Sequence, residues 1–287
     1  MHVDSHFAIG STHRICEDYA LHSLEKAPHV VIADGCSSAK DSDFGARILA
    51  KTAHHYLPDE FPELDGFVYS ILGRATSTAM VLGLPPEALY ATLGTLAINA
   101  DCYQSYFLGD GVVAGKTEGR LYFDHIEFPK SAPYYLQYEN NPEVKRSYIK
   151  EFGGTYKVTA YHSDEPGKWV CEGSEEHIFK EHYFPIIINE FEVADYDFVA
   201  IMTDGVDSVY RKIETATSKT SEKVPITEVV EALLDFKPVG KPNFTGSFVQ
   251  RRFNRVFRDH HDWHHMDDIS VGVIAKGDSN DTSKEAL

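Results

Sequence analysis

Residues 30–50 read VVIADGCSSAKDSDFGARILA, and this stretch decides the fold because a strand passes directly into a helix. The run 29–33 is apolar and β-branched, which is typical of a buried strand, and Asp34 followed by Gly35 stops it. From residue 44 to 56 the apolar side chains recur at helical spacing. An acidic residue at the end of a buried strand is well placed for a functional site.

The rest of the chain contains strand runs and helix runs in an order that indicates an α+β fold. Strands are predicted at residues 6–10, 90–100, 104–115, 119–128, 196–203 and 269–275, and helices at 67–82, 226–236 and 248–259. Residues 129–189 are expected to form strands and irregular cover. Because strands come in hairpins and helices in consecutive pairs, a layered sandwich is favoured over a parallel sheet.

One domain is expected over residues 1–277. The chain has 287 residues, of which 43% are hydrophobic, so it can bury a sizeable core. Two polar stretches interrupt the pattern. Residues 212–223 are interpreted as a surface insertion, and residues 278–287 as a flexible tail.

The composition excludes several classes of protein. A formal net charge of -17, from 27 Lys and Arg against 44 Asp and Glu, argues against a nucleic-acid binder. The chain has no run of 18 apolar residues, so no membrane span is expected. Four widely spaced cysteines suggest neither a zinc knuckle nor a disulfide framework, which fits a reducing compartment. We expect a soluble, cytoplasmic monomer.

Acidic residues stand beside glycine or another acid at five strand ends. They are Glu17-Asp18, Asp34-Gly35, Gly109-Asp110-Gly111, Asp204-Gly205 and Asp267-Asp268. Each pair alone is an ordinary turn. Gathered at one end of a sandwich, however, the carboxylates would repel one another unless a cation lay among them. Hard oxygen ligands of this kind select Mg²⁺ or Mn²⁺ over zinc.

Two such ions, about 3.5 to 4 Å apart, can bridge a hydroxide and polarise a phosphoryl group. The glycine after Asp34 contributes as well, because without a Cβ its backbone carbonyl can approach a metal closely. An acidic protein that handles an anionic phosphate also benefits from a local positive charge. The residues therefore indicate metal-assisted phosphate chemistry.

Five segments resemble, in order, the motifs of the metal-dependent Ser/Thr protein phosphatases of the type 2C class (PPM). The segments are GSTHRICEDYA, VVIADGCSSAKDSDFGARILA, TLGTLAINADCYQSYFLGDGVVAG, VAIMTDGVDSV and MDDISVGVIA, which together span residues 10–275. The resemblance implies a four-layer α-β-β-α sandwich with two central antiparallel sheets. It also implies hydrolysis of phosphoserine and phosphothreonine in a phosphorylated protein substrate.

The resemblance assigns metal-binding roles to seven positions: Glu17, Asp18, Asp34, Gly35, Asp110, Asp204 and Asp267. Asp34 would bridge two Mn²⁺ or Mg²⁺ ions, and the carbonyl of Gly35 would bind one of them. Asp204 and Asp267 would complete the coordination of the other ion. Asp110 matches a residue that helps to hold a third, weaker ion in some members.

Glu17 or Asp18 would meet the second ion, partly through water. The resemblance also implies that the water bridging the two ions is the nucleophile, so no covalent enzyme intermediate is expected. The partner of Asp110 at a third ion usually lies four residues after the second metal-binding Asp, where this chain has Ser208. Two ions are therefore expected.

The segment around the phosphate departs from the family pattern. A histidine that often follows the first Asp-Gly is replaced by Cys36, and position 13, usually arginine, is His13. Either His13 or Arg14 could reach the phosphate, and His13 or metal-bound water could protonate the leaving group. With Asp34 and Asp204, these two residues are the candidate catalytic set.

Other motifs remain open. His261 and His265 have the i, i+4 spacing of zinc ligands on a helix, although a solvated helix end is the plainer interpretation. The basic amphipathic segment 247–258 is either a core helix with a solvated face or a docking face for a phosphorylated partner. Cys36 lacks the glycine-rich cradle that a cysteine phosphatase needs.

Two other functions are kept beside the phosphoprotein phosphatase. One is a catalytically weak, phosphatase-like module that binds a phosphorylated partner. The other is a metal phosphoesterase that acts on a small molecule.

Overall fold

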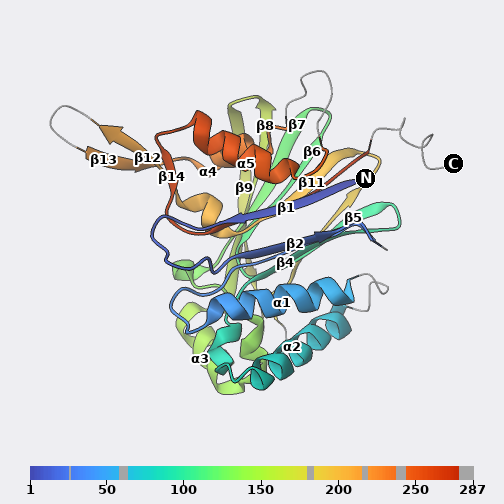
Figure 1. The fold of residues 1–287 in the computed structure, drawn as a ribbon, viewed down its shortest axis with the longest axis vertical. Coiled ribbons are helices and arrows are strands. Elements are labelled where there is room, and N and C mark those ends of the chain that lie inside the picture. The colour runs from blue at the N-terminus through green and yellow to red at the C-terminus, as the bar shows by residue number, and fades with distance from the viewer. Residues whose placement is uncertain (26, 58–63, 180–183, 215–218, 237–243, 278–287) are drawn as a thin grey trace.

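The computed structural model describes residues 1–287 apart from 26, 58–63, 180–183, 215–218, 237–243 and 278–287. Two large antiparallel sheets lie face to face, and helices cover both outer faces (Figure 1). The predicted α+β fold with two central antiparallel sheets flanked by helices is confirmed.

The larger sheet has seven strands, in the spatial order β1 (His2–Ala8), β15 (Ile269–Ala275), β11 (Tyr196–Met202), β6 (Gly111–Thr117), β7 (Arg120–Glu127), β8 (Thr155–Glu165) and β9 (Lys168–Ile178). The second sheet has five, in the order β10 (Ile187–Glu192), β5 (Cys102–Leu108), β4 (Leu93–Asn99), β3 (His29–Ala33) and β2 (Tyr19–Ser23). A small sheet holds β13 (Lys219–Lys223), β12 (Val209–Glu214) and β14 (Trp263–His265).

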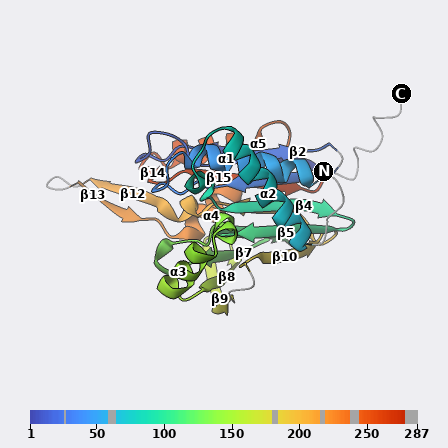
Figure 2. The same cartoon turned by 90° about the horizontal axis from the view of Figure 1, so that it is seen from below.

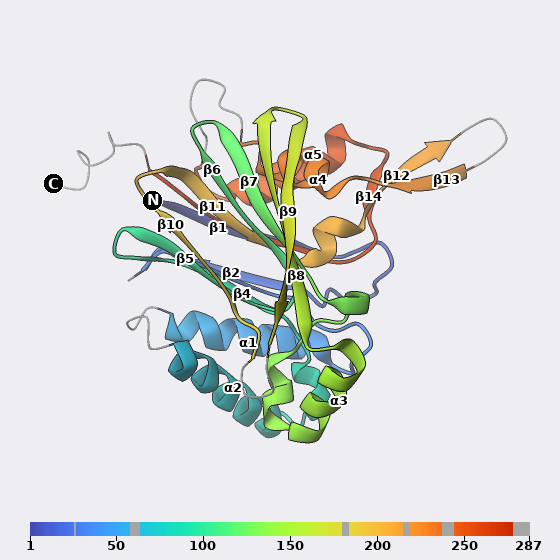
Figure 3. The same ribbon diagram turned by 180° about the vertical axis from the view of Figure 1, so that it is seen from behind.

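Helices α1 (Ser42–Tyr56) and α2 (Leu64–Val81) cover the five-stranded sheet, and α4 (Ile226–Leu234) and α5 (Phe248–Asp259) cover the seven-stranded one. Helix α3 (Pro142–Phe152) lies at the same end of the molecule as α1 and α2 (Figure 3). Short 3₁₀ turns are η1 (Pro86–Leu89), η2 (Pro129–Ser131), η3 (Leu136–Asn140) and η4 (Asp204–Ser208).

Strand β3 shows why the sequence reads as one apolar run rather than an alternating one. Val30 and Ile32 point into the layer between the two sheets, whereas Val31 and Ala33 pack against α1 and α2. Both faces are covered, so every residue of the strand is buried. Since successive side chains of a strand point to opposite faces, only a continuous apolar run satisfies both layers.

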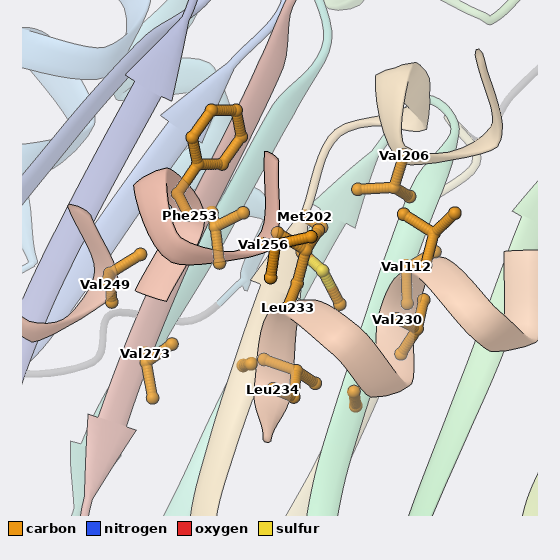
Figure 4. Close-up of a cluster of buried hydrophobic side chains, with 14 of the residues drawn as sticks. Val112, Met202, Val206, Val230, Leu233, Leu234, Val249, Phe253, Val256 and Val273 are labelled. Atoms are coloured by element: carbon orange, nitrogen blue, oxygen red, sulfur yellow. The ribbon is translucent and has the colours of Figure 1, made fainter. Parts of the chain in front are cut away.

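The other outer layer is built in the same way. Figure 4 shows Met202 and Val273 from the seven-stranded sheet beneath Leu233 of α4 and Phe253 and Val256 of α5. This layer, the layer between the sheets and the layer under α1 and α2 form three apolar slabs. By packing the strands of both sheets against their neighbours, these slabs fix the relative positions of the strand ends.

The structure corrects two expectations about elements and adds two elements that the sequence did not predict. The first 35 residues form three strands rather than two, because β2 precedes β3 and β1 covers residues 2–8 instead of 6–10. Residues 129–189 include helix α3. Residues 212–223 contribute to the β12–β13 hairpin, which projects from the body (Figure 2). Residues 263–265 form strand β14.

Among the described residues, no helix is long and apolar enough to cross a membrane. The predicted tail at 278–287 lies outside the described part of the chain.

Candidate active site

Five of the predicted carboxylates lie where strands of both sheets begin or end. Asp34 follows β3, and Asp204 follows β11. Asp110 lies in the turn between β5 and β6, Asp18 precedes β2, and Asp267 lies two residues before β15. The stacked sheets bring these segments of chain together: the Thr203 hydroxyl beside Asp204 donates to Asp18 at 2.8 Å, and burial followed by the charges of Asp18 and Asp204 raises the pKa of Asp34.

Two hydrogen bonds to Thr92 hold the backbone of Asp34 in place. Its amide donates to the Thr92 hydroxyl at 3.2 Å, and the Thr92 amide donates to the Asp34 carbonyl at 2.8 Å. Gly35 makes an isolated antiparallel bridge with Ala91. The loop that carries the central carboxylate is therefore fixed on one side by the segment between η1 and β4.

Asp18 is fully buried, with no exposed surface. Its carboxylate accepts a hydrogen bond from the Thr203 hydroxyl at 2.8 Å, and that hydroxyl accepts the amide of Ser270 at 2.8 Å. The chain thus links the start of β2, the end of β11 and the start of β15. The sequence did not predict Thr203 as a site residue, because its role depends on partners far away along the chain.

Burial and mutual repulsion raise the pKa values of the carboxyls well above their ordinary range. For Asp34 the causes, in order, are burial and the charges of Asp18 and Asp204. Burial raises the pKa of Asp18 to about 7, and burial with the neighbouring charge of Asp267 raises that of Asp204 to about 6. Burial and the charge of Asp204 also raise the pKa of Asp110.

These carboxyls fit a divalent cation. Within the described residues, Oδ1 of Asp18 and Oδ1 of Asp110 are buried without a hydrogen-bond donor. A buried acceptor left without a donor costs free energy, and these two acceptors, together with the raised pKa values of the carboxyls, favour the binding of a positive charge. Oxygen donors of this type suit Mg²⁺ or Mn²⁺.

Two glycines allow the backbone to close around the carboxylates. A Cβ at Gly35 would lie 2.8 Å from the carbonyl oxygen of Ser42, and one at Gly205 would lie 1.7 Å from the carbonyl oxygen of Asp268. Both distances are shorter than a carbon and an oxygen can approach. The Asp-Gly pairs are thus required by packing as well as by turn geometry.

Asp267 differs from the buried carboxylates, since its side chain is 44% exposed. Its amide donates to the Ser208 hydroxyl at 3.0 Å, and this hydroxyl donates to the Gly205 carbonyl at 2.7 Å. Ser208 therefore ties the loop after β11 to the segment before β15.

Asp268, the second residue of its pair, was not predicted as a site residue. It is 2% exposed and accepts the amides of Gly10 at 2.6 Å and Glu17 at 2.5 Å. It clamps the loop between β1 and β2 to the start of β15. The two residues of the Asp-Asp pair therefore have different roles: Asp267 is partly exposed, and Asp268 accepts hydrogen bonds from the backbone.

His13 lies inside this loop, among the acidic side chains. Its Nε2 is 3.4 Å from Asp267 Oδ1, and its Nδ1 is 3.2 Å from Asp268 Oδ1 and 3.8 Å from Glu17 Oε2. Arg14, the next residue, is exposed. The structure brings His13 together with the carboxylates and leaves Arg14 on the surface of the same loop.

Cys36 lies beside an aromatic group that the sequence did not reveal. Its amide donates to the Tyr90 carbonyl at 2.8 Å, and its thiol is 3.1 Å from the Ser38 hydroxyl. Tyr135, from the segment between η2 and η3, stacks on Tyr90 with ring centroids 5.7 Å apart. Burial, followed by the nearby Cys36, raises the pKa of the Tyr135 hydroxyl.

The structure also places two residue sets around the carboxylates. Arg47 of α1 pairs with Asp43 at 3.0 Å, one helical turn away. The helical zinc-ligand spacing of His261 and His265 is wrong, because α5 ends at Asp259 and His265 lies in β14. His261 lies in the turn between α5 and β14, so the two histidines are not stacked one helical turn apart.

Similar solved structures share this architecture at low identity. They include the serine/threonine phosphatase of S. agalactiae (12% identity, TM-score 0.53, covering 96% of this chain and 99% of that chain). PppA of Pseudomonas aeruginosa matches with 16% identity and a TM-score of 0.50, covering 96% and 97%. The catalytic domain of the phosphatase PstP in complex with two manganese ions matches with 13% identity and a TM-score of 0.50, covering 94% and 96%.

No curated protein matches the chain. The structural likenesses, at identities this low, establish the fold. Family membership comes from the sequence itself, since the model of the family described as protein phosphatase 2C matches residues 9–236, and the strand ends that carry Asp18, Asp34, Asp110 and Asp204 all fall within that range. This chain belongs to the protein phosphatase 2C family.

Proposed function

We propose that this chain is a metal-dependent phosphoprotein phosphatase that hydrolyses phosphoserine and phosphothreonine. The observation that carries the proposal is the group of buried carboxyls of Asp18, Asp34 and Asp204, whose pKa values are raised by burial and by one another. A cation removes that repulsion, so the site is built for one. PstP, a similar structure, is described in complex with two manganese ions.

In this proposal the Asp34 carboxylate and the Gly35 carbonyl would hold two Mn²⁺ or Mg²⁺ ions together with Asp18, Asp204 and Asp267. When bound, the ions supply an activated water and polarise the phosphate ester. Burial of the carboxyls keeps bulk water from competing for them. The exposed edge of the site at Asp267 gives a phosphorylated side chain its approach.

The chain's own residues around the phosphate differ from the usual family set. His13 occupies the position where an arginine is common, and its ring is fixed by the surrounding carboxylates rather than free to swing. Arg14 is exposed on the same loop and supplies positive charge for the phosphate. Tyr135 lies next to Cys36, and burial followed by this neighbour raises the pKa of the Tyr135 hydroxyl.

The experiment is hydrolysis of a phosphoserine or phosphothreonine peptide with and without Mn²⁺. Activity is expected to need added Mn²⁺ and to disappear with a chelator. Asp34→Asn is expected to lower kcat by at least about a hundredfold, whereas the exposed Asp164→Asn serves as matched control. Full activity in the presence of a chelator would refute the metal mechanism.

A second candidate is a catalytically weak module that binds a phosphorylated partner. It is favoured by Cys36 and His13, which replace the histidine and arginine common in the family. Calorimetry with a phosphopeptide at saturating Mn²⁺ separates the two, because retained binding without turnover supports the module. Turnover of small phosphate esters but not of phosphopeptides would instead indicate a small-molecule phosphoesterase.

A further inference from the structure

The carboxyls of Asp18, Asp34, Asp110, Asp204 and Asp267 are together called the Asp34 centre. His13, Glu17 and Asp268 converge beside it. One nitrogen of His13 and one carboxylate oxygen from each acid lie within 4.8 Å of one another. Nδ1 of His13 is 3.2 Å from Asp268 and 3.8 Å from Glu17. Donor atoms at about 2.0 to 2.2 Å from one tetrahedral zinc ion are separated by roughly 3.3 to 3.6 Å. The two distances bracket that spacing.

Nδ1 of His13 faces the two acids, so the neutral form of the imidazole can bind a cation beside them. Nδ1 is shielded from solvent and, among the described residues, has no hydrogen-bond partner in line with it, despite the short distance to Asp268. The opposite ring nitrogen, Nε2, faces Asp267 Oδ1 at 3.4 Å. A histidine that binds a metal through one nitrogen usually gives its other N–H to a carboxylate, and this arrangement matches that pattern.

The two acids are also supported from outside the cluster. Ser42 donates its hydroxyl to Glu17 Oε1 at 3.3 Å, which leaves Oε2 toward His13. Asp268 is fixed by the amides of Gly10 and Glu17. Each of the three donors is therefore held by a partner of its own, which sets this cluster apart from a surface group of acids.

We propose that His13, Glu17 and Asp268 form a separate cation site for a zinc-class transition-metal ion, with water as the remaining ligand. The nitrogen donor distinguishes it from the all-oxygen Asp34 centre, because imidazole favours Zn²⁺ and Co²⁺ over Mg²⁺. Asp267 connects the two, since the carboxylate assigned to the Asp34 centre also faces His13. This site does not depend on turnover at the Asp34 centre.

The test uses the full chain with the Asp34→Asn substitution, which removes the central bridging carboxylate. Calorimetry is expected to show one Zn²⁺ bound by this variant, with little competition from Mg²⁺. Adding His13→Ala should weaken Zn²⁺ binding at least tenfold. Adding His55→Ala, which removes an exposed histidine of α1, should leave it unchanged.

Two further measurements guard against a folding effect. Co²⁺ bound to Asp34→Asn should give a visible absorption band that is lost with His13→Gln as well as with His13→Ala. Crystals soaked in dilute Zn²⁺ should show an anomalous peak between His13 Nδ1, Glu17 and Asp268. Equal Zn²⁺ affinity in the His13→Ala and His55→Ala variants would overturn the proposal. So would an anomalous peak beside residue 34 with none at His13.

The outcome is separable from that of the phosphatase assay. A protein that binds Zn²⁺ through His13 but hydrolyses no phosphopeptide supports this site and refutes the proposed function. A protein that hydrolyses phosphopeptides with Mn²⁺ but shows no dependence of Zn²⁺ binding on His13 does the reverse.

Discussion

Asp268 accepts the amides of Gly10 and Glu17, which lie 258 and 251 positions earlier in the chain. Removing a buried acceptor leaves those N–H groups without a partner, and each such group costs about 1 to 3 kcal/mol. Asp268→Ala is therefore expected to lower the free energy of unfolding by about 3 kcal/mol. Urea denaturation measures it, and the exposed Asp164→Ala is the control.

Asp268→Asn sharpens the same test. The amide keeps one acceptor oxygen, so a loss smaller than that of the alanine variant is expected. If the alanine variant unfolds at the same urea concentration as the wild type, the clamp contributes nothing to stability.

The sequence was informative about single residues when their role is local. Asp34 and Asp204 were found because each follows an apolar strand and precedes a glycine, a signal contained in a few adjacent residues. Thr203 and Asp268 gave no such signal, because their partners are Asp18 and the amides of the N-terminal loop. Long-range hydrogen bonds leave no local pattern.

At the scale of elements, two helical glycines have opposite roles. A Cβ at Gly45 of α1 would lie 1.6 Å from the carbonyl oxygen of Ala88, so the helix packs against η1 through this glycine. A Cβ at Gly73 of α2 would meet nothing within 4 Å. Gly45 is fixed by tertiary packing, while Gly73 only weakens its helix.

Gly73→Ala is expected to stabilise the protein by about 0.5 to 1 kcal/mol, and Gly45→Ala to destabilise it by about 1 to 3 kcal/mol. Paired thermal and urea unfolding of the two variants measures the difference in sign. If both variants change the free energy of unfolding in the same direction, helix propensity rather than tertiary packing determines the effect.

The contact between β3 and α1 includes a pair of histidines. His29 Nε2 and His54 Nδ1 are 2.9 Å apart, and burial, the leading cause for both, lowers their pKa values. The unfolded chain then binds protons near the ordinary value of 6.5 while the folded chain does not. Their contribution to stability is present above pH 6.5 and is lost as the pH falls through that value toward the lowered folded pKa values.

His54→Asn should reduce the pH dependence of the unfolding free energy between pH 6.5 and 5, by up to about 1.4 kcal/mol per pH unit. Urea denaturation across that range gives the slope. His55→Asn, one residue further on the exposed face, is the control, and an identical slope in both variants would contradict the prediction.

Elements were predicted well when their pattern was long and was not interrupted by aromatic residues. Helix α3 was missed because Tyr and Pro surround it, although Asn141 caps it and accepts the amides of Glu143 and Val144. Gly153 ends it in the left-handed region, at φ 83°. The Asn-Pro start and the Gly end are helix signals that outweigh a weak apolar period. Strand β14 is too short to leave any pattern.

At the scale of the whole molecule, cation binding should raise the free energy of unfolding. The carboxyls at the Asp34 centre repel one another without a cation, so a bound ion stabilises the folded chain only. Mn²⁺ at a hundred times its dissociation constant is expected to add about 2.7 kcal/mol per site to the free energy of unfolding. A chelator should remove this gain.

The control must separate binding from screening, because the net charge of -17 makes any salt favourable. Unfolding in sodium chloride of equal ionic strength measures the screening alone. Asp34→Asn should retain the effect of sodium chloride and lose most of the effect of Mn²⁺. An equal gain from both salts in the wild type would contradict specific binding.

The predicted sandwich followed from the succession of hairpins and paired helices. The strand order did not, since β15 lies between β1 and β11, far from both in sequence. Pairings across such separations depend on which apolar faces fit together in three dimensions. The sequence therefore indicated the layers and left the order within each layer open.

The pairing of β1 with β15 has a consequence for how the protein is made. His2 lies opposite Ala275, and the clamp from Asp268 closes the loop that holds Asp18. On the ribosome, the segments that carry Asp18 and Asp34 emerge long before their partners. A polypeptide that ends before Asp267 would lack Asp267 and the Asp268 clamp, so premature termination leaves the group of carboxylates incomplete and the loop that carries Asp18 without its partner.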